Sequence, residues 1–424
     1  MPARLIPSLT DRESLDTIFA PIAHHAAIGL AVSGGADSLA LMLLAHAWVE
    51  ARGGGPVIHV YAVDHGLRAE AAGEVAMVLA QAARLGLKAR GLVWDGIKPA
   101  TGVQEAARIA RYGLMGAAMR ADGVPVLLTA HHRADQAETV LMRMAHGSGL
   151  EGLKAMAPMG NVEGVTVCRP LLDVDPADLR SVVDLAGLTP ADDPSNYDTH
   201  YERVRWRQAM PMLAELGLDA KTLARFAQRM GEADAAIAKL AEASFGQLVS
   251  LDGFGAARVD AAGFIDLSPA VAMRVLGRVL KIVGGRQKPR ALGVVERLTQ
   301  AIFEESLEKS VTLLGCVVRL QKDALVVARE PGRMLASNAA LAPRSELVWD
   351  ERFLIINGSD EAGLTAGVAD YLPRHRLEEF LGFKVTAPAE AIRTAPIVRD
   401  AAGSVLSLGG WSFDDRIVVK LLID

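Results

Sequence analysis

Short apolar runs alternate with stretches of helical periodicity over the first half of the chain. Five apolar runs are typical of buried strands: Ile28–Val32, Val57–Val63, Ala89–Trp94, Val124–Thr129 and Val165–Arg169. Helical stretches lie near residues 38–51, 69–86, 103–121, 133–146 and 176–187. This alternation predicts an α/β fold, in which a doubly wound parallel sheet has helices on both faces. In such sheets, ligands bind at the carboxyl ends of the strands.

The pattern changes beyond residue 200. Residues 200–245 have helical periodicity and no clear strands. Further along we expect a hairpin in Asp252–Asp266, helices over Pro269–Val283 and Ala291–Glu305, two strands in Ser310–Ala328, a linker over Pro331–Arg344, and β-like runs at Leu347–Ile356 and Ile417–Ile423. The expected organisation is an α/β domain over 1–210, a mainly helical domain over 211–335 and a small α+β domain over 345–424.

Composition excludes several classes of protein. No run approaches the length of about 18 apolar residues that a membrane span needs, and the first residues lack the apolar centre of a signal peptide. Only two cysteines occur, Cys168 and Cys316, and they are far apart. This excludes a disulfide scaffold and any C-x-x-C metal or iron–sulfur motif. We therefore expect a cytoplasmic protein.

Charge is distributed unevenly along the chain. The net charge is −5, yet residues 200–335 hold 20 Lys and Arg against 15 Asp and Glu. A basic middle segment of this kind permits a surface that binds a polyanion such as RNA. A solvated helical face would give the same count.

Residues 31–38, Ala-Val-Ser-Gly-Gly-Ala-Asp-Ser, are the most informative stretch. They lie between a predicted strand and a predicted helix, where Gly34 and Gly35 allow backbone N–H groups to approach a phosphate at the helix N-terminus. Ser33 and Ser38 add hydroxyl groups. Asp37 would repel a bare phosphate, which suggests a bridging Mg²⁺ ion. A tight turn serving only packing is the alternative.

The sequence argues against two other kinds of nucleotide-binding loop. The chain has no Gly-x-x-x-x-Gly-Lys-[Ser/Thr] sequence, and its Gly-x-Gly-x-x-Gly sequence at residues 147–152 follows a predicted helix and not a predicted strand, which argues against a dinucleotide site. The spacing Ser-Gly-Gly-x-Asp-Ser instead resembles the loop of the N-type ATP pyrophosphatases. That resemblance implies cleavage of ATP between its α and β phosphates, with ATP contacts from Ser33, Gly34, Gly35, Ala36, Asp37 and Ser38.

Other polar groups follow the predicted strands. Asp64 and His65 end the second strand and could position adenosine, with Arg68 near a phosphate, although charged turns are common at strand ends. Arg108 and Arg111 share one face of a helix and could bind phosphate or form ion pairs with neighbouring groups.

A pair of carboxylates begins the helix after the fourth strand. Asp135 and Glu138 are three residues apart, so they lie on one face and suit an ammonium group. An acidic helix start that serves only the helix dipole is the alternative. The adjacent His131 and His132 cannot share a helical face as ligands, which makes zinc improbable.

Several segments then follow the loop in a fixed order: Val63–Arg68, Gln104–Tyr112, His131–Thr139, Gly147–Leu153, Arg169–Leu172, Asp193–Asn196 and Arg203–Arg207. Together with the loop, they resemble the tRNA(Ile)-lysidine synthetase family over roughly residues 25–215. Four positions depart from the usual family sequence: Ala134 replaces Asp, His146 replaces Arg, Val204 replaces Asn and Trp206 replaces Ile.

This resemblance implies a complete reaction. The C2 oxygen of the wobble cytidine in tRNA(Ile) with a CAU anticodon attacks the α phosphate of ATP, with Mg²⁺ bound by Asp37, and pyrophosphate leaves. The amine of L-lysine then displaces AMP to form lysidine. The catalytic residues would be Asp37, Asp135 and Glu138, and the lysine-binding residues Asp135, Glu138, Arg203 and Arg207.

The resemblance also implies which groups contact RNA. The domains over 211–335 and 345–424 would bind tRNA, and candidate contacts are Arg108, Arg111, Arg205, Arg225, Arg229, Arg274, Arg278 and the segment 286–290. A homodimer is compatible with the family. The alternative is a tRNA thiolase or another ATP pyrophosphatase with the same loop.

Overall fold

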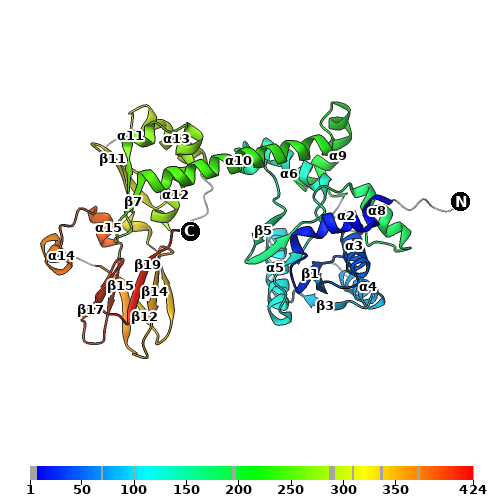
Figure 1. Ribbon diagram of the computed structural model, residues 1–424, viewed down its shortest axis with the longest axis horizontal. Helices are drawn as coiled ribbons and strands as arrows, with labels where there is room; N and C mark the ends of the chain where they lie inside the picture. The colour runs from blue at the N-terminus through cyan, green and yellow to red at the C-terminus, as the bar shows by residue number, and fades with distance from the viewer. Residues whose placement is uncertain are drawn as a thin grey trace. The chain divides into compact units, whose positions relative to one another are not determined.

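A computed structural model describes residues 7–67, 70–96, 98–99, 101–192, 197–285, 292–307, 310–334, 338–369 and 373–423. The predicted contacts at Arg68, 193–196 and 286–290 lie outside these residues. The chain divides into two compact units, Met1–Asp234 and Ala235–Asp424, each of which is described by itself. Both are drawn in Figure 1. No helix in the described ranges is long and apolar enough to cross a membrane.

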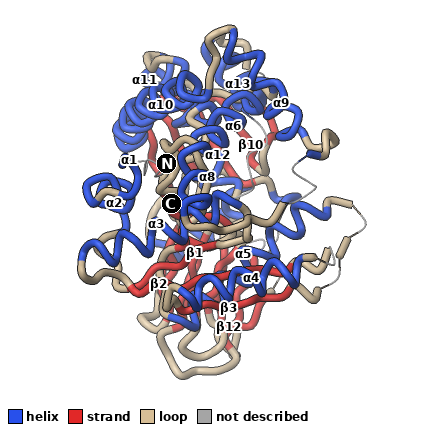
Figure 2. The backbone as a smooth tube through the Cα atoms, turned by 90° about the vertical axis from the view of Figure 1, so that its right-hand side faces the viewer, coloured by secondary structure: helices blue, strands red, loops and turns tan. Residues whose placement is uncertain are grey.

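The first unit is built on a six-stranded sheet of order β3-β2-β1-β4-β6-β5. The strands are β1 (Ala27–Ala31), β2 (Val57–Asp64), β3 (Lys88–Val93), β4 (Leu127–Leu128), β5 (Met159–Val162) and β6 (Val165–Cys168). Five strands are parallel, and β1, β2 and β3 are seen side by side in Figure 2. Only β5 is antiparallel, to β6. The predicted doubly wound α/β fold is confirmed.

Helices α2 (Arg12–Phe19), α3 (Ala36–Arg52), α4 (Ala71–Arg84) and α8 (Pro176–Leu185) pack on one face of this sheet, and α5 (Val103–Asp122) packs on the other. Helices α6 (Arg133–Ala145), α9 (Glu202–Glu215) and α10 (Ala220–Leu248) share a separate hydrophobic cluster. The unit also contains α1 (Pro7–Thr10), α7 (Leu150–Leu153) and a 3₁₀ turn, η1 (Ala20–Ile22). Helix α10 contains the boundary between the two units.

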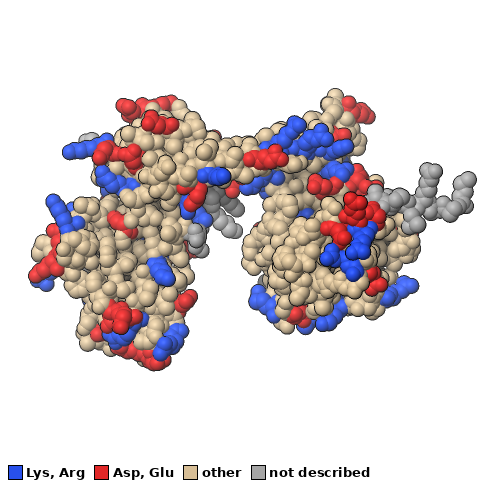
Figure 3. Space-filling view, viewed as in Figure 1, with Lys and Arg blue, Asp and Glu red and all other residues tan. Residues whose placement is uncertain are grey.

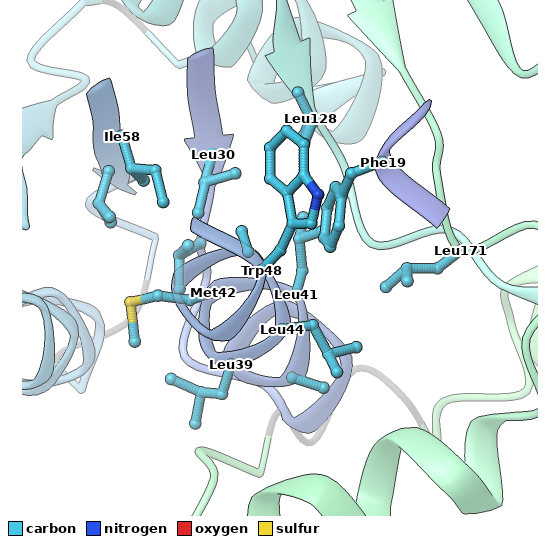
Figure 4. Close-up of a cluster of buried hydrophobic side chains, with 14 of the residues drawn as sticks. Phe19, Leu30, Leu39, Leu41, Met42, Leu44, Trp48, Ile58, Leu128 and Leu171 are labelled. Carbon is cyan, nitrogen blue, oxygen red and sulfur yellow. The ribbon is translucent and has the colours of Figure 1, made fainter. Parts of the chain in front are cut away.

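Alternation along the strands sends side chains into two separate cores. In β2, Ile58 and Val60 point toward a core formed with α2, α3, α4 and α8, where Trp48 stacks on Phe19 with ring centroids 5.0 Å apart (Figure 4). Tyr61 points to the opposite face and packs against α5. A parallel sheet buried on both faces is the result.

The second unit contains three antiparallel sheets. Their orders are β7-β8-β11-β10-β9, β12-β15-β16-β17-β18 and β13-β14-β19. The strands are β7 (Val249–Leu251), β8 (Ala257–Asp260), β9 (Val311–Leu313), β10 (Cys316–Gln321), β11 (Ala324–Arg329), β12 (Ala339–Leu341), β13 (Glu346–Trp349), β14 (Phe353–Asn357), β15 (Leu364–Val368), β16 (Pro396–Arg399), β17 (Val405–Leu408), β18 (Trp411–Ser412) and β19 (Ile417–Leu421). The helices are α11 (Ala261–Ile265), α12 (Pro269–Gly284), α13 (Leu292–Phe303), α14 (Arg374–Leu381) and α15 (Ala389–Arg393), with a 3₁₀ turn η3 (Pro331–Arg333).

Several predicted boundaries were wrong. The strand expected over Val124–Thr129 is only the two residues of β4, and β5 was not predicted. Ser310–Ala328 overlaps three strands instead of two, because turns at Leu314 and Lys322, both with positive φ, divide it. The expected linker over 331–344 contains η3 and β12. The division into three domains stays a prediction.

A buried ionic cluster joins distant segments of the second unit. Both Asp350 oxygens accept hydrogen bonds from Arg329, at 2.9 Å, and one accepts from Arg352 at the same distance. Arg329 also donates to the carbonyls of Gly284 and Gly315, and Arg352 donates to that of Thr394. Burial lowers the pKa of Arg352 to about 10, although the adjacent carboxylate opposes this shift. One carboxylate therefore stabilises two buried guanidinium groups.

We expect Asp350→Asn to destabilise the second unit by about 3–5 kcal/mol, because it leaves buried cations without their counter-charge. Chemical unfolding of the full chain measures this. The matched control is Asp360→Asn, which removes the carboxylate of an exposed pair with Arg344 and should leave unfolding unchanged. Equal unfolding curves for the two variants would contradict the expectation.

Candidate active site

The glycine-rich loop leaves the carboxyl end of β1 and opens directly into α3. Gly34 has φ of +91°, a conformation that favours glycine, and a Cβ there would lie 3.1 Å from the Met77 methyl group. Gly35 is the N-cap of α3, and Ala36 is its first residue. The N–H groups of the first helical turn are therefore available to an anion.

Two serine hydroxyls hold the loop in shape. The buried Ser38 hydroxyl donates to the Gly35 carbonyl at 2.9 Å and accepts from the Ser33 N–H at 3.1 Å. The two hydroxyl oxygens lie 3.3 Å apart. At the other side, the Ala191 N–H donates to the Gly34 carbonyl at 3.0 Å. Because these contacts are internal, the loop is formed before any ligand binds.

His132 connects this loop to the predicted carboxylate pair. Its Nε2 lies 3.5 Å from the Asp37 Oδ2 and 3.6 Å from the Asp135 Oδ2. His132 is also the N-cap of α6, and the Asp135 carboxylate accepts its N–H at 3.0 Å in a capping box. The imidazole thus lies between a carboxylate on α3 and one on α6.

Two opposing effects set the charge of this imidazole. Burial lowers the pKa of His132, but the hydrogen bond to Asp37 and the negative charges of Asp135, Asp37 and Glu138 together raise it more. The net direction is upward from the usual 6.5. The protonated form is favoured between the carboxylates. The sequence alone did not predict a role for His132 in the site, although His132 lies in the family-like segment His131–Thr139.

Glu138 is surrounded by guanidinium groups. Its side chain is only 1% exposed, and its Oε1 accepts from the Arg207 Nε at 2.8 Å while its Oε2 forms an ion pair with the Arg203 Nε at 3.3 Å. The hydrogen bond to Glu138 raises the pKa of Arg207. The structure thus brings together all four predicted lysine-binding residues, but it pairs Glu138 with arginines.

A second group of cations surrounds His131. Burial chiefly lowers the pKa of His131, and the nearby charges of Arg169, Arg203 and Arg111 lower it further, while Asp135 opposes them. Arg108 and Arg111 both stack on the Tyr112 ring, with the guanidinium carbons 5.2 and 5.4 Å from its centroid. A neutral imidazole among arginines leaves a positive region suited to an anion.

Arg169 begins one of the segments that resemble the family, and the sequence predicts no role for it. Its guanidinium is largely buried and donates to the Ala157 carbonyl at 2.9 Å. Burial lowers its pKa, and the charge of Arg108 acts in the same direction. Such a cation attracts an anion strongly because water screens it poorly.

The remaining residues predicted to bind ATP or tRNA make contacts other than those around His131, His132 and Glu138. Asp64 ends β2, next to β1, and accepts the Gly66 N–H at 2.7 Å, with His65 following it. Arg205 donates to the carbonyls of Thr199 and His200, at 2.9 and 3.0 Å. Arg274 and Arg278 belong to the second unit, where Arg278 pairs with Glu242 and stacks on Phe245.

Two of the four departures from the family sequence meet at one carboxylate. The Glu202 Oε1 lies 3.1 Å from the His146 Nε2 and accepts the Trp206 indole N–H at 3.2 Å. This joins the end of α6 to the start of α9. Val204 is a buried residue of α9, and Ala134 lies in the first turn of α6.

No cluster of three or more metal-ligating side chains occurs in the described ranges. Asp37 is 43% exposed at the end of a phosphate-type loop. A single carboxylate of this kind fits Mg²⁺, which proteins usually bind through one or two carboxylates together with substrate phosphates.

Residues 7–213 match the family model of the PP-loop domain. With the parallel sheet and the preformed loop, this match defines an enzyme of the ATP-using PP-loop class. The chain is 43% identical over 340 residues to tRNA(Ile)-lysidine synthase of Rhodopseudomonas palustris, covering 76% of this chain and 98% of that protein. The enzymes of the same name from Bradyrhizobium sp. BTAi1 and Ruegeria pomeroyi are 41% and 38% identical, over 75% and 77% of this chain and 94% and 76% of theirs. The chain belongs to the tRNA(Ile)-lysidine synthase family.

We expect Asp37→Asn to lower the pKa of His132, because it removes a hydrogen-bonding carboxylate that favours the imidazolium form. The histidine ring titration followed by NMR measures this. Since the folded-state pKa is raised, protonated His132 stabilises the fold fully below pH 6.5, and this stabilisation is lost as pH rises through the folded-state pKa. The dependence of the free energy of unfolding on pH should therefore be weaker in Asp37→Asn than in the unsubstituted protein.

Asp184→Asn is the matched control, because Asp184 is an exposed residue of the same unit that pairs with Arg180. Its substitution should leave the His132 titration unchanged. If His132 titrates identically in Asp37→Asn and in the unsubstituted protein, this would contradict the bridge that His132 forms between Asp37 and Asp135.

Proposed function

We propose that the protein joins L-lysine to C2 of the wobble cytidine of tRNA(Ile) with a CAU anticodon. ATP adenylates the C2 oxygen and releases pyrophosphate, and lysine then displaces AMP. The observation on which this depends most is the bridge through His132, since it joins a phosphate loop to a carboxylate suited to an amine. Membership of the tRNA(Ile)-lysidine synthase family supports the choice of substrates.

The first step requires stabilisation of negative charge. Ser33, Gly34, Gly35, Ala36 and Ser38 would hold the phosphates through loop N–H and hydroxyl groups. Asp37 would hold Mg²⁺, which supplies further positive charge to the departing pyrophosphate. Asp64 and His65, at the end of the neighbouring strand, would lie against the adenosine.

The second step requires an oriented amine. With Glu138 engaged by two arginines, Asp135 is the carboxylate that would hold the lysine amine. Glu138 would act by fixing Arg203 and Arg207, whose remaining donors would bind the lysine carboxylate. Asp135 would also take up the proton that the amine loses as it attacks C2.

The tRNA would contact exposed cations around this site. Lys221, Arg225 and Arg229 are exposed on α10 and spaced by four residues, so they lie on one face of the helix. In the view of Figure 3, Lys and Arg side chains gather over α9 and the adjoining part of α10. Arg108 and Arg111 would bind phosphate closer to the reaction.

The cysteines do not favour the thiolase alternative. Cys168 and Cys316 are each buried in the core of a different unit. Burial raises their pKa values, to about 11 and about 12 respectively, which disfavours the reactive thiolate. Lysidine formation is therefore the better-supported reaction.

The decisive experiment incubates the protein with ATP, radiolabelled lysine and unmodified tRNA(Ile) bearing a CAU anticodon. We expect lysine-dependent label on the RNA, and we expect Asp37→Ala to abolish it while the circular dichroism spectrum is retained. Asp184→Ala, an exposed carboxylate of the same unit, is the control and should keep full activity. An unlabelled RNA with the unsubstituted protein would refute the proposed function.

Asp135→Asn should raise the KM for lysine by about 10-fold or more, since a hydrogen bond to a charged group contributes roughly 1.5–3 kcal/mol. Glu138→Gln should raise the same KM and also lower stability, because the two arginines lose their buried counter-charge. Steady-state kinetics and chemical unfolding distinguish the two effects. Glu151→Gln, an exposed neighbour, is the control, and an unchanged lysine KM in Asp135→Asn would contradict its assignment.

A further inference from the structure

A polar cavity of about 260 Å³ lies in the first unit, away from the phosphate loop. Its charged and polar lining comes from β2, β3 and the end of α5, and we call these five residues the β2–β3 pocket: His59, Tyr61, Lys88, Arg90 and Asp122. His59 stands five residues before Asp64, the last residue of β2, so about 16 Å of strand separates them. The pocket therefore lies toward the amino ends of the strands, whereas the phosphate loop follows a carboxyl end.

The register of β2 and β3 brings four of these side chains together. His59 lies opposite Lys88, and Tyr61 lies opposite Arg90. Since residues two apart in a strand share a face, all four side chains lie on the face of the sheet that packs against α5. Because β3 is an edge strand, Lys88 and Arg90 are exposed, while His59 and Tyr61 are buried. The pocket thus has a buried floor and a cationic rim.

The negative charge of Asp122 is already balanced within the β2–β3 pocket. Its side chain is 8% exposed, and its Oδ2 accepts from the Tyr61 hydroxyl at 2.9 Å while its Oδ1 accepts from the Arg90 guanidinium. The N–H groups of Gly123 and Val124 cap the last carbonyls of α5, which reduces the negative end of the helix dipole at this place. The acidic side of the pocket therefore repels an anion only weakly.

Two nitrogen atoms of the β2–β3 pocket have no hydrogen-bond partner in the described part of the chain. One is the Lys88 ammonium group, which also forms no ion pair there. The other is the Nε2 of His59, a residue that is only 8% exposed. Burial chiefly lowers the pKa of His59, Asp122 opposes this, and the charges of Lys88 and Arg90 lower it further. A neutral imidazole beside two cations, one of them unpaired, favours an anion in the cavity.

We propose that the β2–β3 pocket binds the phosphate group of a small molecule, either inorganic phosphate or a phosphomonoester. Lys88 and the remaining N–H groups of Arg90 supply charged donors, and the Nε2 of His59 becomes a third donor when the anion favours the imidazolium form. A cavity of about 260 Å³ has the volume of roughly eight water molecules, which accommodates a tetrahedral oxyanion with part of its hydration. The site lies beyond the proposed function and does not depend on it.

The test follows the His59 ring by NMR while inorganic phosphate or AMP is added to the full chain without tRNA, lysine or ATP. His59→Gln assigns the signal by removing it, and an anion bound at the phosphate loop is detected separately at His132. We expect a saturable shift of the His59 signal and a rise of its pKa by about 1 or more, because an adjacent anion favours the imidazolium form. The anion that shifts His59 at the lower concentration identifies the source of the phosphate group.

Three variants make the result specific. Lys88→Gln should weaken the binding measured at His59 by about tenfold, because it removes one charge-assisted hydrogen bond. Lys88→Arg keeps the charge and should keep most of the affinity. Arg84→Gln is the matched control: it removes an exposed cation from α4, which packs on the opposite face of the same sheet, and it should leave the affinity unchanged.

A His59 signal that does not respond to millimolar phosphate or AMP would overturn the proposal, and Lys88 and Arg90 would then serve only to protect the edge strand β3 from pairing with other chains. An equal response to sodium chloride at the same ionic strength would overturn it too, as would an equal loss of affinity in Lys88→Gln and Arg84→Gln. Lysidine formation is not measured in this experiment, so the proposed function and the β2–β3 pocket can fail separately.

Discussion

The site depends on the adjacency of β1 and β4 in the sheet. The chain passes from β1 to β2 on one side, yet β4 pairs with β1 on the other side, with Gly29 opposite Leu127 and Leu30 opposite Leu128. At such a reversal of strand order the loops that follow the two strands diverge and leave a crevice. The phosphate loop follows β1 and the His132 cap follows β4. The contact between Asp37 and His132 depends on this adjacency of the two strands.

Electrostatics then divides the crevice into regions of alternating sign. The phosphate loop presents N–H groups, the next region holds Asp37, His132 and Asp135, and beyond it Glu138 pairs with two arginines. Opposite charges in contact offset the desolvation that each would suffer alone. The residues proposed to bind the nucleotide and those proposed to bind lysine thus lie next to each other.

Much of this arrangement could be predicted from the sequence, because it depends on local patterns. Glycines at 34 and 35 between a strand and a helix indicate an anion site, and carboxylates at 135 and 138 share a helical face by spacing alone. The partners of Glu138 could not be predicted from periodicity, since Arg207 is 69 residues away on α9. Nor could β5, an antiparallel edge strand containing Gly160, or the shortness of β4, which spans only Leu127–Leu128 of the apolar run Val124–Thr129.

The buried cluster around Asp350 has a consequence for how the second unit can be shortened. Arg329 belongs to β11, whereas its carboxylate partner comes from the turn after β13, later in the chain. A chain that stops after β11 would keep a buried guanidinium group with no counter-charge, on a strand at the centre of its own sheet. Premature termination after β11 would therefore lower the stability of the sheet that contains β11. For this reason the stability of the segment that ends at β11 requires translation to continue at least past Asp350.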